Sequence, residues 1–154
     1  MEILNYILAV VITFLGLFVG FLLALIAEEE LKPGKPYFIF LQNLIFSLII
    51  FFLLFFSELT VWLAILIATL TFIFLIKTNI NSIAIYLSLA FIFNGAFRNL
   101  LKVFILEASL VFIYGIITGS LVTYKLKNKK LKTVKELIIK YGIFIPLAII
   151  LFFL

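Results

Sequence analysis

The chain of 154 residues contains no histidine, no cysteine and no aspartate. Zinc, haem and iron–sulfur centres are usually held by histidine and cysteine side chains, so the sequence predicts no metal site and no cofactor of these kinds. The same absences exclude thiol chemistry, a Ser-His-Asp triad and acid–base catalysis by imidazole. We therefore expect that this protein is not an enzyme.

Charged residues are also scarce. They make up 12% of the chain, hydrophobic residues make up 67%, and the mean hydropathy is +1.41. Soluble domains are about 25% charged and about 45–50% apolar, so the excess apolar surface indicates a protein whose partner is the lipid bilayer. Most of the net charge of +5 lies in one lysine-rich loop between apolar stretches. We interpret this loop as a cytoplasmic anchor and expect no nucleic-acid partner.

Long apolar stretches fill almost the whole chain. A helix of about 20 residues crosses a hydrocarbon core of about 30 Å. The sequence therefore predicts an all-α fold, a polytopic transmembrane helix bundle with short loops that forms one integral membrane domain over residues 1–154. The expected spans cover residues 3–27, 37–56, 59–76, 80–93, 100–124 and 137–154. The last of them is only just long enough to cross, so five spans are the alternative to six.

The segment between the first two expected spans contains Pro33, Gly34 and Pro36. We expect these residues to keep residues 28–36 out of any helix. The three glutamates at 28–30 would then close the first helix, at the end where the helix dipole disfavours negative charge. A solvated run of charge is the simplest interpretation of these glutamates, and metal or proton binding is the alternative.

The distribution of lysines predicts the orientation in the membrane. With six spans, the loops on one side contain nine lysines, six of them in the Lys125–Lys135 loop, whereas the other side contains Arg98 and Lys102. Loops rich in lysine and arginine stay in the cytoplasm. The sequence therefore predicts a multi-pass protein of the cell membrane, with the Lys125–Lys135 loop cytoplasmic and both termini outside.

Small residues recur at intervals of four in two of the expected spans. The first span contains Gly16, Gly20 and Ala24, and the fifth contains Gly115 and Gly119. Helices in lipid approach closely where small residues leave room, so these positions are expected to pack against another helix. That helix belongs either to the same chain or to a partner, which is a second copy or a larger membrane complex. The sequence alone leaves both alternatives open.

A charged residue inside a membrane span is a functional candidate. Glu107 lies in the fifth span, and Tyr114 and Thr118 share its helix face. If Tyr124 marks the inner boundary, Glu107 lies about 25 Å away, near the outer edge of a core of about 30 Å. Three interpretations follow: an interfacial charge that reaches water or a nearby basic side chain, a carboxylate that binds a proton or an ion, and a buried ion pair.

A polar break is predicted at residues 94–99, which include Asn94, Arg98 and Asn99. We expect it to end the fourth span. It forms either a short outer loop or a discontinuous element that lines a site.

Two functional classes fit these observations. In the first, the chain is a small membrane component without catalytic chemistry, which associates with itself or with partners. In the second, it is a minimal ion- or proton-coupled or small-solute transporter or channel that uses Glu107 and the Asn94–Asn99 break. A further polar cluster of Gln42, Asn43 and Ser47 lies near the inner end of the second span, and its amides are expected to hydrogen-bond across helices. Six short helices leave few residues for a solvated pathway, so the sequence favours the first class.

Overall fold

The computed structural model describes residues 3–57, 59–78, 82–98, 101–126 and 130–154, and all of the regular structure in these ranges is helical. The prediction of an all-α fold is confirmed. The elements are α1 (Ile3–Ile26), α2 (Glu28–Phe56), α3 (Val61–Lys77), α4 (Ser82–Phe97), α5 (Leu101–Lys125), α6 (Lys130–Glu136), the π-helical turn η1 (Leu137–Tyr141) and α7 (Phe144–Phe153).

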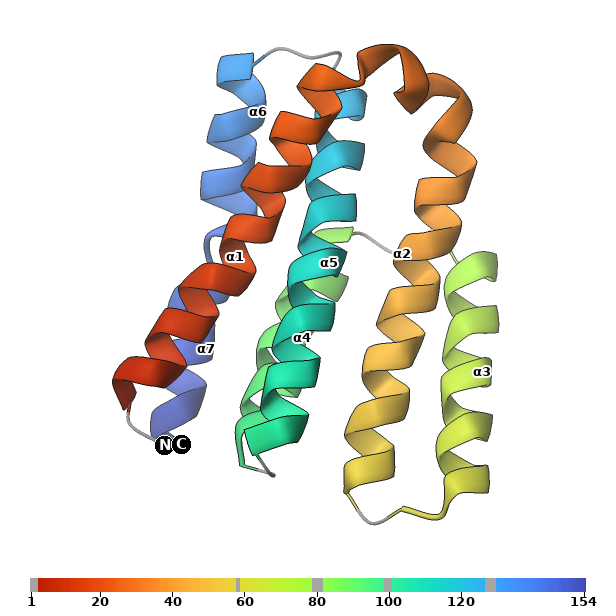
Figure 1. The fold of residues 1–154 in the computed structure, drawn as a ribbon, viewed down its shortest axis with the longest axis vertical. Helices are drawn as coiled ribbons and strands as arrows, with labels where there is room; N and C mark the ends of the chain where they lie inside the picture. The colour runs from red at the N-terminus through yellow and green to blue at the C-terminus, as the bar shows by residue number, and fades with distance from the viewer. Residues whose placement is uncertain (1–2, 58, 79–81, 99–100, 127–129) are drawn as a thin grey trace.

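Helices α1 to α5 alternate in direction, α6, η1 and α7 continue in one direction, and the start of α1 and the end of α7 lie side by side at one end of the bundle (Figure 1). Helix α5 lies at the centre and packs against α1, α2 and α4. Helix α3 packs against α2, and α7 packs against α4 and α1. We call the end that holds the termini the terminal end, and the opposite end the lysine end, because Lys35 of α2 and Lys125 of α5 lie there.

Four helical stretches are long and apolar enough to cross a membrane, namely Ile3–Ile26, Glu28–Phe56, Leu101–Lys125 and Lys130–Phe153. Helices α3 and α4 are apolar but shorter, with 17 and 16 residues. They occupy only the half of the bundle near the terminal end, and they stop well short of the lysine end (Figure 1). A helix of 17 residues is about 25 Å long, whereas α2 with its 29 residues is about 43 Å long.

The expectation that residues 28–36 are not helical is wrong. The chain leaves helical geometry only at Ala27, and α2 begins at Glu28 and runs through both prolines. Pro33 and Pro36 remove the hydrogen bonds that the carbonyls of Glu29 and Lys32 would accept, but these two residues are exposed and their carbonyls can bond to water. The helix bends in this region, so its first turns lie across the lysine end (Figure 1).

The three glutamates at 28–30 consequently begin a helix, whereas the sequence placed them at the end of one. Unpaired backbone N–H groups give a helix a positive N-terminus, and carboxylates in its first turn stabilise it. The glutamates therefore favour the start of α2 at the position where the prolines were expected to forbid a helix.

The last helical run begins at Lys130, which is earlier than the predicted start at Leu137. The second half of the expected Lys125–Lys135 loop is thus helical, and residues 127–129 of that loop lie outside the described residues. The π-helical turn η1 lies in this helical run just before Gly142 and Pro146, and it is wider than an α-helical turn. Pro146 has no N–H for the carbonyl of Gly142, and the N–H of Ile145 bonds to that carbonyl at 3.2 Å.

Aromatic side chains fill the core at the terminal end. The ring of Tyr6 lies 4.8 Å from the rings of both Phe97 and Phe152, and Phe93 lies 4.9 Å from Phe104. The hydroxyl of Tyr6 donates a hydrogen bond of 3.0 Å to the carbonyl of Ala148, a residue of α7. Aromatic rings at these distances attract one another beyond their burial, so aromatic side chains close the core at this end of the bundle.

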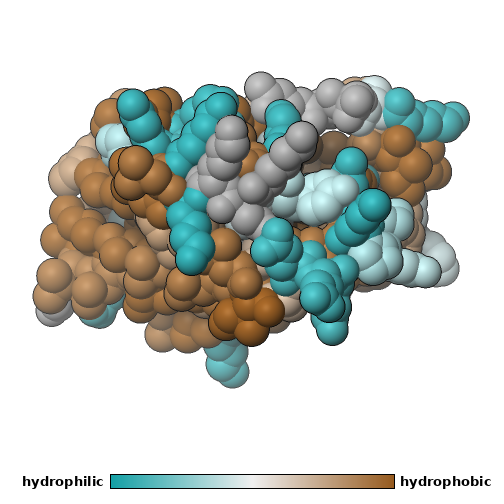
Figure 2. Space-filling view, turned by 90° about the horizontal axis from the view of Figure 1, so that it is seen from above, coloured by the Kyte–Doolittle hydropathy of each residue, from teal (hydrophilic) through white to brown (hydrophobic). Residues whose placement is uncertain are grey.

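The outer surface is largely apolar. Large hydrophobic side chains are exposed along α1, α2, α3 and α7, and Trp62 of α3 is 82% exposed. Seen from the lysine end, hydrophilic residues gather over that end and hydrophobic residues surround them (Figure 2). A molecule with apolar sides and one polar end is compatible with insertion into a membrane.

Candidate functional site

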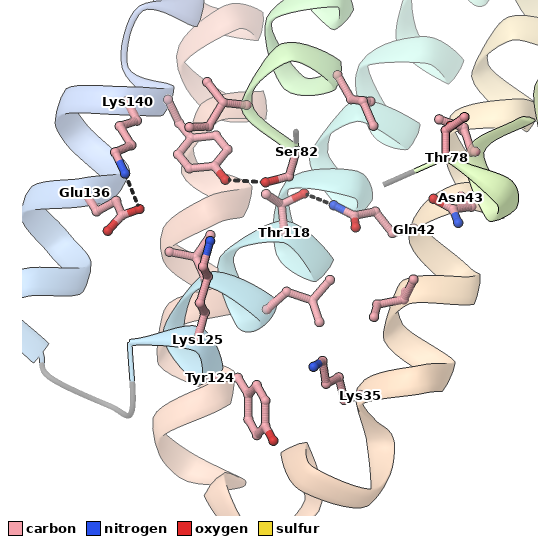
Figure 3. A pocket seen from close by; sticks show the side chains of 17 residues that line it. Lys35, Gln42, Asn43, Thr78, Ser82, Thr118, Tyr124, Lys125, Glu136 and Lys140 are labelled. Carbon is pink, nitrogen blue, oxygen red and sulfur yellow. Dashed lines mark hydrogen bonds and ion pairs between the residues drawn. The ribbon is translucent and has the colours of Figure 1, made fainter. Parts of the chain in front are cut away.

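A cavity of about 650 Å³ lies between α2, α5 and the α6–η1 segment, at the lysine end of the bundle (Figure 3). Thr78, which follows α3, and Ser82, which begins α4, both line it. Both helices stop short of the lysine end (Figure 1), and the cavity lies beside the helix ends that Thr78 and Ser82 mark.

Two hydrogen bonds between side chains lie at the inner end of the cavity, which we call the floor. The amide Nε2 of Gln42 donates to Oγ1 of Thr118 over 2.8 Å, which joins α2 to α5. The hydroxyls of Ser82 and Tyr141 lie 2.9 Å apart and join α4 to η1. Gln42, Thr118 and Tyr141 are each less than 10% exposed. The buried polar groups of the floor are thus largely satisfied, and they fix the relative positions of four elements.

Charged and apolar side chains together line the rest of the cavity. Nζ of Lys140 lies 2.6 Å from Oε1 of Glu136, one helical turn before it. Nζ of Lys35 lies 5.6 Å from the centre of the Tyr124 ring. The side chain of Lys125 extends along the cavity toward the floor (Figure 3), and no ion pair of Lys125 is found among the described residues.

Two of the three lysines that line the cavity, Lys35 and Lys125, lie at matching positions on antiparallel helices. Lys35 precedes Gln42 by seven residues on α2, and Lys125 follows Thr118 by seven residues on α5. Seven residues are about two helical turns, or about 10 Å. Each helix thus presents one lysine above one neutral polar group on the same face.

Glu107 is fully buried, and neither of its carboxylate oxygens has a hydrogen-bond partner within the described residues. The depth estimate from the sequence had placed it near a membrane boundary, within reach of Lys102 and Arg98. Glu107 is buried instead, because α5 lies in the middle of the bundle and its neighbours cover this side chain at any depth in a membrane. Lys102 and Arg98 are both exposed.

The other predicted residues of the fifth span share this buried face. Tyr114 and Thr118 are each 1% exposed, and the hydroxyl of Thr118 donates to the carbonyl of Tyr114 over 2.8 Å. The Tyr86 ring of α4 lies 6.2 Å from the ring of Tyr114, and its hydroxyl is buried without a partner within the described residues. Unpaired polar groups thus extend from the floor toward the terminal end.

The polar break expected at residues 94–99 is wrong for its first half. Helix α4 continues through Asn94 to Phe97, and the amide Nδ2 of Asn94 donates to the carbonyl of Leu151 over 2.8 Å. This bond joins α4 to α7, so Asn94 serves packing between helices. Arg98 is exposed just after the helix, and Asn99 lies outside the described residues. The cavity lies at the other end of α4, where Ser82 lines it.

The small residues lie where α1 crosses α5. A Cβ atom added to Gly20 would lie 1.9 Å from the carbonyl oxygen of Ile116, and one added to Gly119 would lie 2.1 Å from that of Leu17. A Cβ atom on Gly16 would lie 2.3 Å from the carbonyl oxygen of Phe112, and one on Gly115 would lie 3.2 Å from the backbone nitrogen of Leu17. We call this contact the glycine seam. Ala24 is also buried, and Ser120 donates to the carbonyl of Gly20 over 3.0 Å. These glycines contact the same chain, so they are covered and not free to bind a second copy.

Sequence reasoning identified Gln42 and Asn43 as a polar cluster but missed Lys35, Ser82 and Tyr141 as neighbours of that cluster. The spacing of seven residues on α2 and α5 is visible in the sequence. It predicts a shared face within one helix, and it says nothing of which helices border the same space.

No group of three or more acidic side chains that could hold a metal ion occurs among the described residues. Comparison of the chain with protein-family models, with curated proteins and with solved structures finds no match. The function is therefore argued from the geometry of the site alone.

Proposed function

We propose that this chain is a multi-pass membrane protein with six crossings, in which α3 and α4 cross only part of the bilayer as full helices. The four long apolar helices and the apolar outer surface support this arrangement. The lysine end faces the cytoplasm, because lysine-rich ends of membrane proteins are retained there. Both termini then lie outside, at the closed aromatic end.

Within that arrangement, the protein is a minimal transporter that admits a small polar solute from the cytoplasm. The observation that carries this proposal is the cavity of about 650 Å³ beside the ends of α3 and α4. Helix ends expose unpaired backbone groups, which are tolerated at membrane depth only where they are buried in protein or line a wet cavity. Helix ends that lie within the membrane form the binding sites of many transporters.

The path beyond the floor runs along α5. Thr118, Glu107 and Phe104 follow one another toward the terminal end, and Glu107 lies about 16 Å beyond Thr118 along the helix. Phe104 belongs to the aromatic cluster that closes the terminal end. The arrangement is that of a carrier open to the cytoplasm and closed to the outside, with Glu107 as the group that couples solute movement to a proton.

The alternative of a non-transporting membrane component has less support. Its most specific sequence signal was the stripe containing Gly16 and Gly20, and this stripe packs against α5 of the same chain. The proposed transport role is also non-enzymatic, because it requires binding and movement of a solute and no covalent step.

The test is proton flux in liposomes that contain purified protein and an entrapped pH-sensitive dye, with the membrane potential imposed by a potassium gradient. With a panel of small polar solutes supplied on the same side as the protons, we expect at least one solute to make the wild type acidify the lumen faster than empty liposomes do, and we expect Glu107→Gln to remove this excess. Glu30→Gln is the matched control, since Glu30 is exposed at the start of α2. Wild-type flux equal to that of empty liposomes would refute transport, and full flux in Glu107→Gln would refute the assigned carboxylate.

A further inference from the structure

The charges that line the cavity do not balance. Lys35, Lys125 and Lys140 line it together with one acidic side chain, Glu136. The ion pair between Lys140 and Glu136 cancels two of these charges, which leaves the two charges of Lys35 and Lys125. A solute that enters from the lysine end therefore meets a positive field before it reaches the floor.

The identity of these basic residues indicates the kind of anion. The single arginine of the chain, Arg98, follows the end of α4 nearest the termini, so no guanidinium lines the cavity. Arginine holds a planar carboxylate with two parallel hydrogen bonds, whereas lysine acts as a compact point charge that suits a phosphate. A phosphate monoester carries a charge of about −1.5 to −2 at neutral pH, which matches the two unbalanced lysines.

The start of α4 adds to this field. Ser82 begins the helix and lines the cavity, so the positive end of the α4 dipole faces the same space. Half-helices in transporters direct their N-termini at anionic groups of the substrate in this way.

The floor is neutral and rich in hydrogen-bonding groups. The amides of Gln42 and Asn43 and the hydroxyls of Ser82 and Tyr141 can donate and accept, as the hydroxyls of a polyol do. The backbones of Lys35 and Lys125 lie about 10 Å from those of Gln42 and Thr118 along α2 and α5, and the side chain of Lys125 extends toward the floor (Figure 3). The cavity volume lies in the range of small-molecule sites, so one compact molecule with a charged end and a neutral polar end fits between the lysines and the floor.

We propose that the cavity binds a phosphate ester of a small polyol, with the phosphate at Lys35 and Lys125 and the hydroxyls at the floor. This phosphate belongs either to a soluble metabolite or to the headgroup of a glycerol-based anionic lipid. The assignment rests on the proposed function for the accessibility of the cavity, but binding does not require transport. A failure of flux and a failure of binding are therefore separate results.

The test measures binding of glycerol phosphate by titration calorimetry to protein in nanodiscs of uncharged phosphatidylcholine. The decisive variant is Lys35→Gln with Lys125→Gln. The control is Lys130→Gln with Lys132→Gln, two lysines of α6 that line no part of this cavity and whose loss lowers the net charge equally. We expect the decisive variant to weaken binding about tenfold or more at low salt and the control to change it less than about twofold. Unphosphorylated glycerol should not bind measurably.

A second arm separates the two sources of phosphate. Protein is purified in the presence of phosphatidylglycerol, and retained lipid is counted by native mass spectrometry. Retention by the wild type and the control variant, with loss from the decisive variant, assigns the cavity to the lipid headgroup. Binding of glycerol phosphate with the same pattern of loss assigns it to a soluble ester. If neither molecule binds, or if both double variants lose binding equally, the proposal is wrong. Circular dichroism verifies that each variant is folded.

Discussion

The two sides of α5 differ sharply over the same stretch of helix. On one side, Gly115 and Gly119 bring the backbone of α5 against that of α1, with no room for a Cβ atom at Gly119. On the other side, Thr118, Val122 and Lys125 border a cavity of about 650 Å³. Helices in lipid associate mainly through close packing. The bundle is therefore held together on the glycine side, and this leaves the opposite side free to hold solvent and a solute.

The largest expected effect on stability comes from adding a side-chain atom at the glycine seam. In Gly20→Ala the new Cβ would lie 1.9 Å from the carbonyl oxygen of Ile116, so α1 and α5 must separate. We expect a loss of about 2–4 kcal/mol in the free energy of unfolding, because backbone cannot move aside as a flexible side chain can. Titration with SDS, followed by circular dichroism, measures this change.

The matched control is Gly95→Ala in α4. Its Cβ would lie 3.5 Å from a side-chain carbon of Leu53, which is ordinary van der Waals contact. Alanine favours a helix over glycine, so the control should be neutral or more stable by up to about 1 kcal/mol. Equal responses of the two variants would show that α1 and α5 do not meet at the glycine seam.

The next substitution is expected to raise the free energy of unfolding. Glu107 buries both carboxylate oxygens without a partner in the described part of the chain, so its burial costs stability. Glu107→Met has a similar volume and no polar oxygens. We expect it to raise the free energy of unfolding by about 1–2 kcal/mol while it removes the proton flux. A clear loss of stability would mean that the carboxyl has a partner in the folded protein.

A smaller change in the free energy of unfolding tests whether water reaches the floor of the cavity. Thr118→Val removes the acceptor of the Gln42 amide. If water fills the cavity, the amide finds a new partner there, and the free energy of unfolding should fall by about 1 kcal/mol or less. Thr123→Val is the control, because Thr123 is buried on the same helix and bonds to the carbonyl of Gly119. A loss of about 3 kcal/mol at Thr118 would indicate a dry floor.

The sequence predicted the central helix well. Residues 100–124 were expected to be helical and α5 covers Leu101–Lys125, because a long, mainly apolar run without proline permits little else. The prediction that Pro33 and Pro36 exclude a helix was wrong, because the effect of a proline depends on whether the carbonyls that lose their hydrogen bonds reach water. That is a property of the folded environment and not of the residue type.

The candidate site was predicted only in part. The residues Gln42, Thr118 and Glu107 were recognised as polar groups inside apolar helices. Their roles depend on neighbours that the sequence does not reveal: a cavity at the ends of α3 and α4 lies beside the first two, and central packing buries the third. Depth along a helix follows from residue numbers, but burial depends on which helices surround it.

The central claim is that the space beside α5 is wet and opens toward the cytoplasm. The chain contains no cysteine, so a single introduced thiol reports its own surroundings. Asn43→Cys lines the cavity, and Leu41→Cys lies at nearly the same depth on the apolar outer face of α2. A membrane-impermeant maleimide should label Asn43→Cys from the lysine end alone and leave Leu41→Cys unlabelled. Labelling of both thiols, of neither, or of Asn43→Cys from the terminal end would contradict the account.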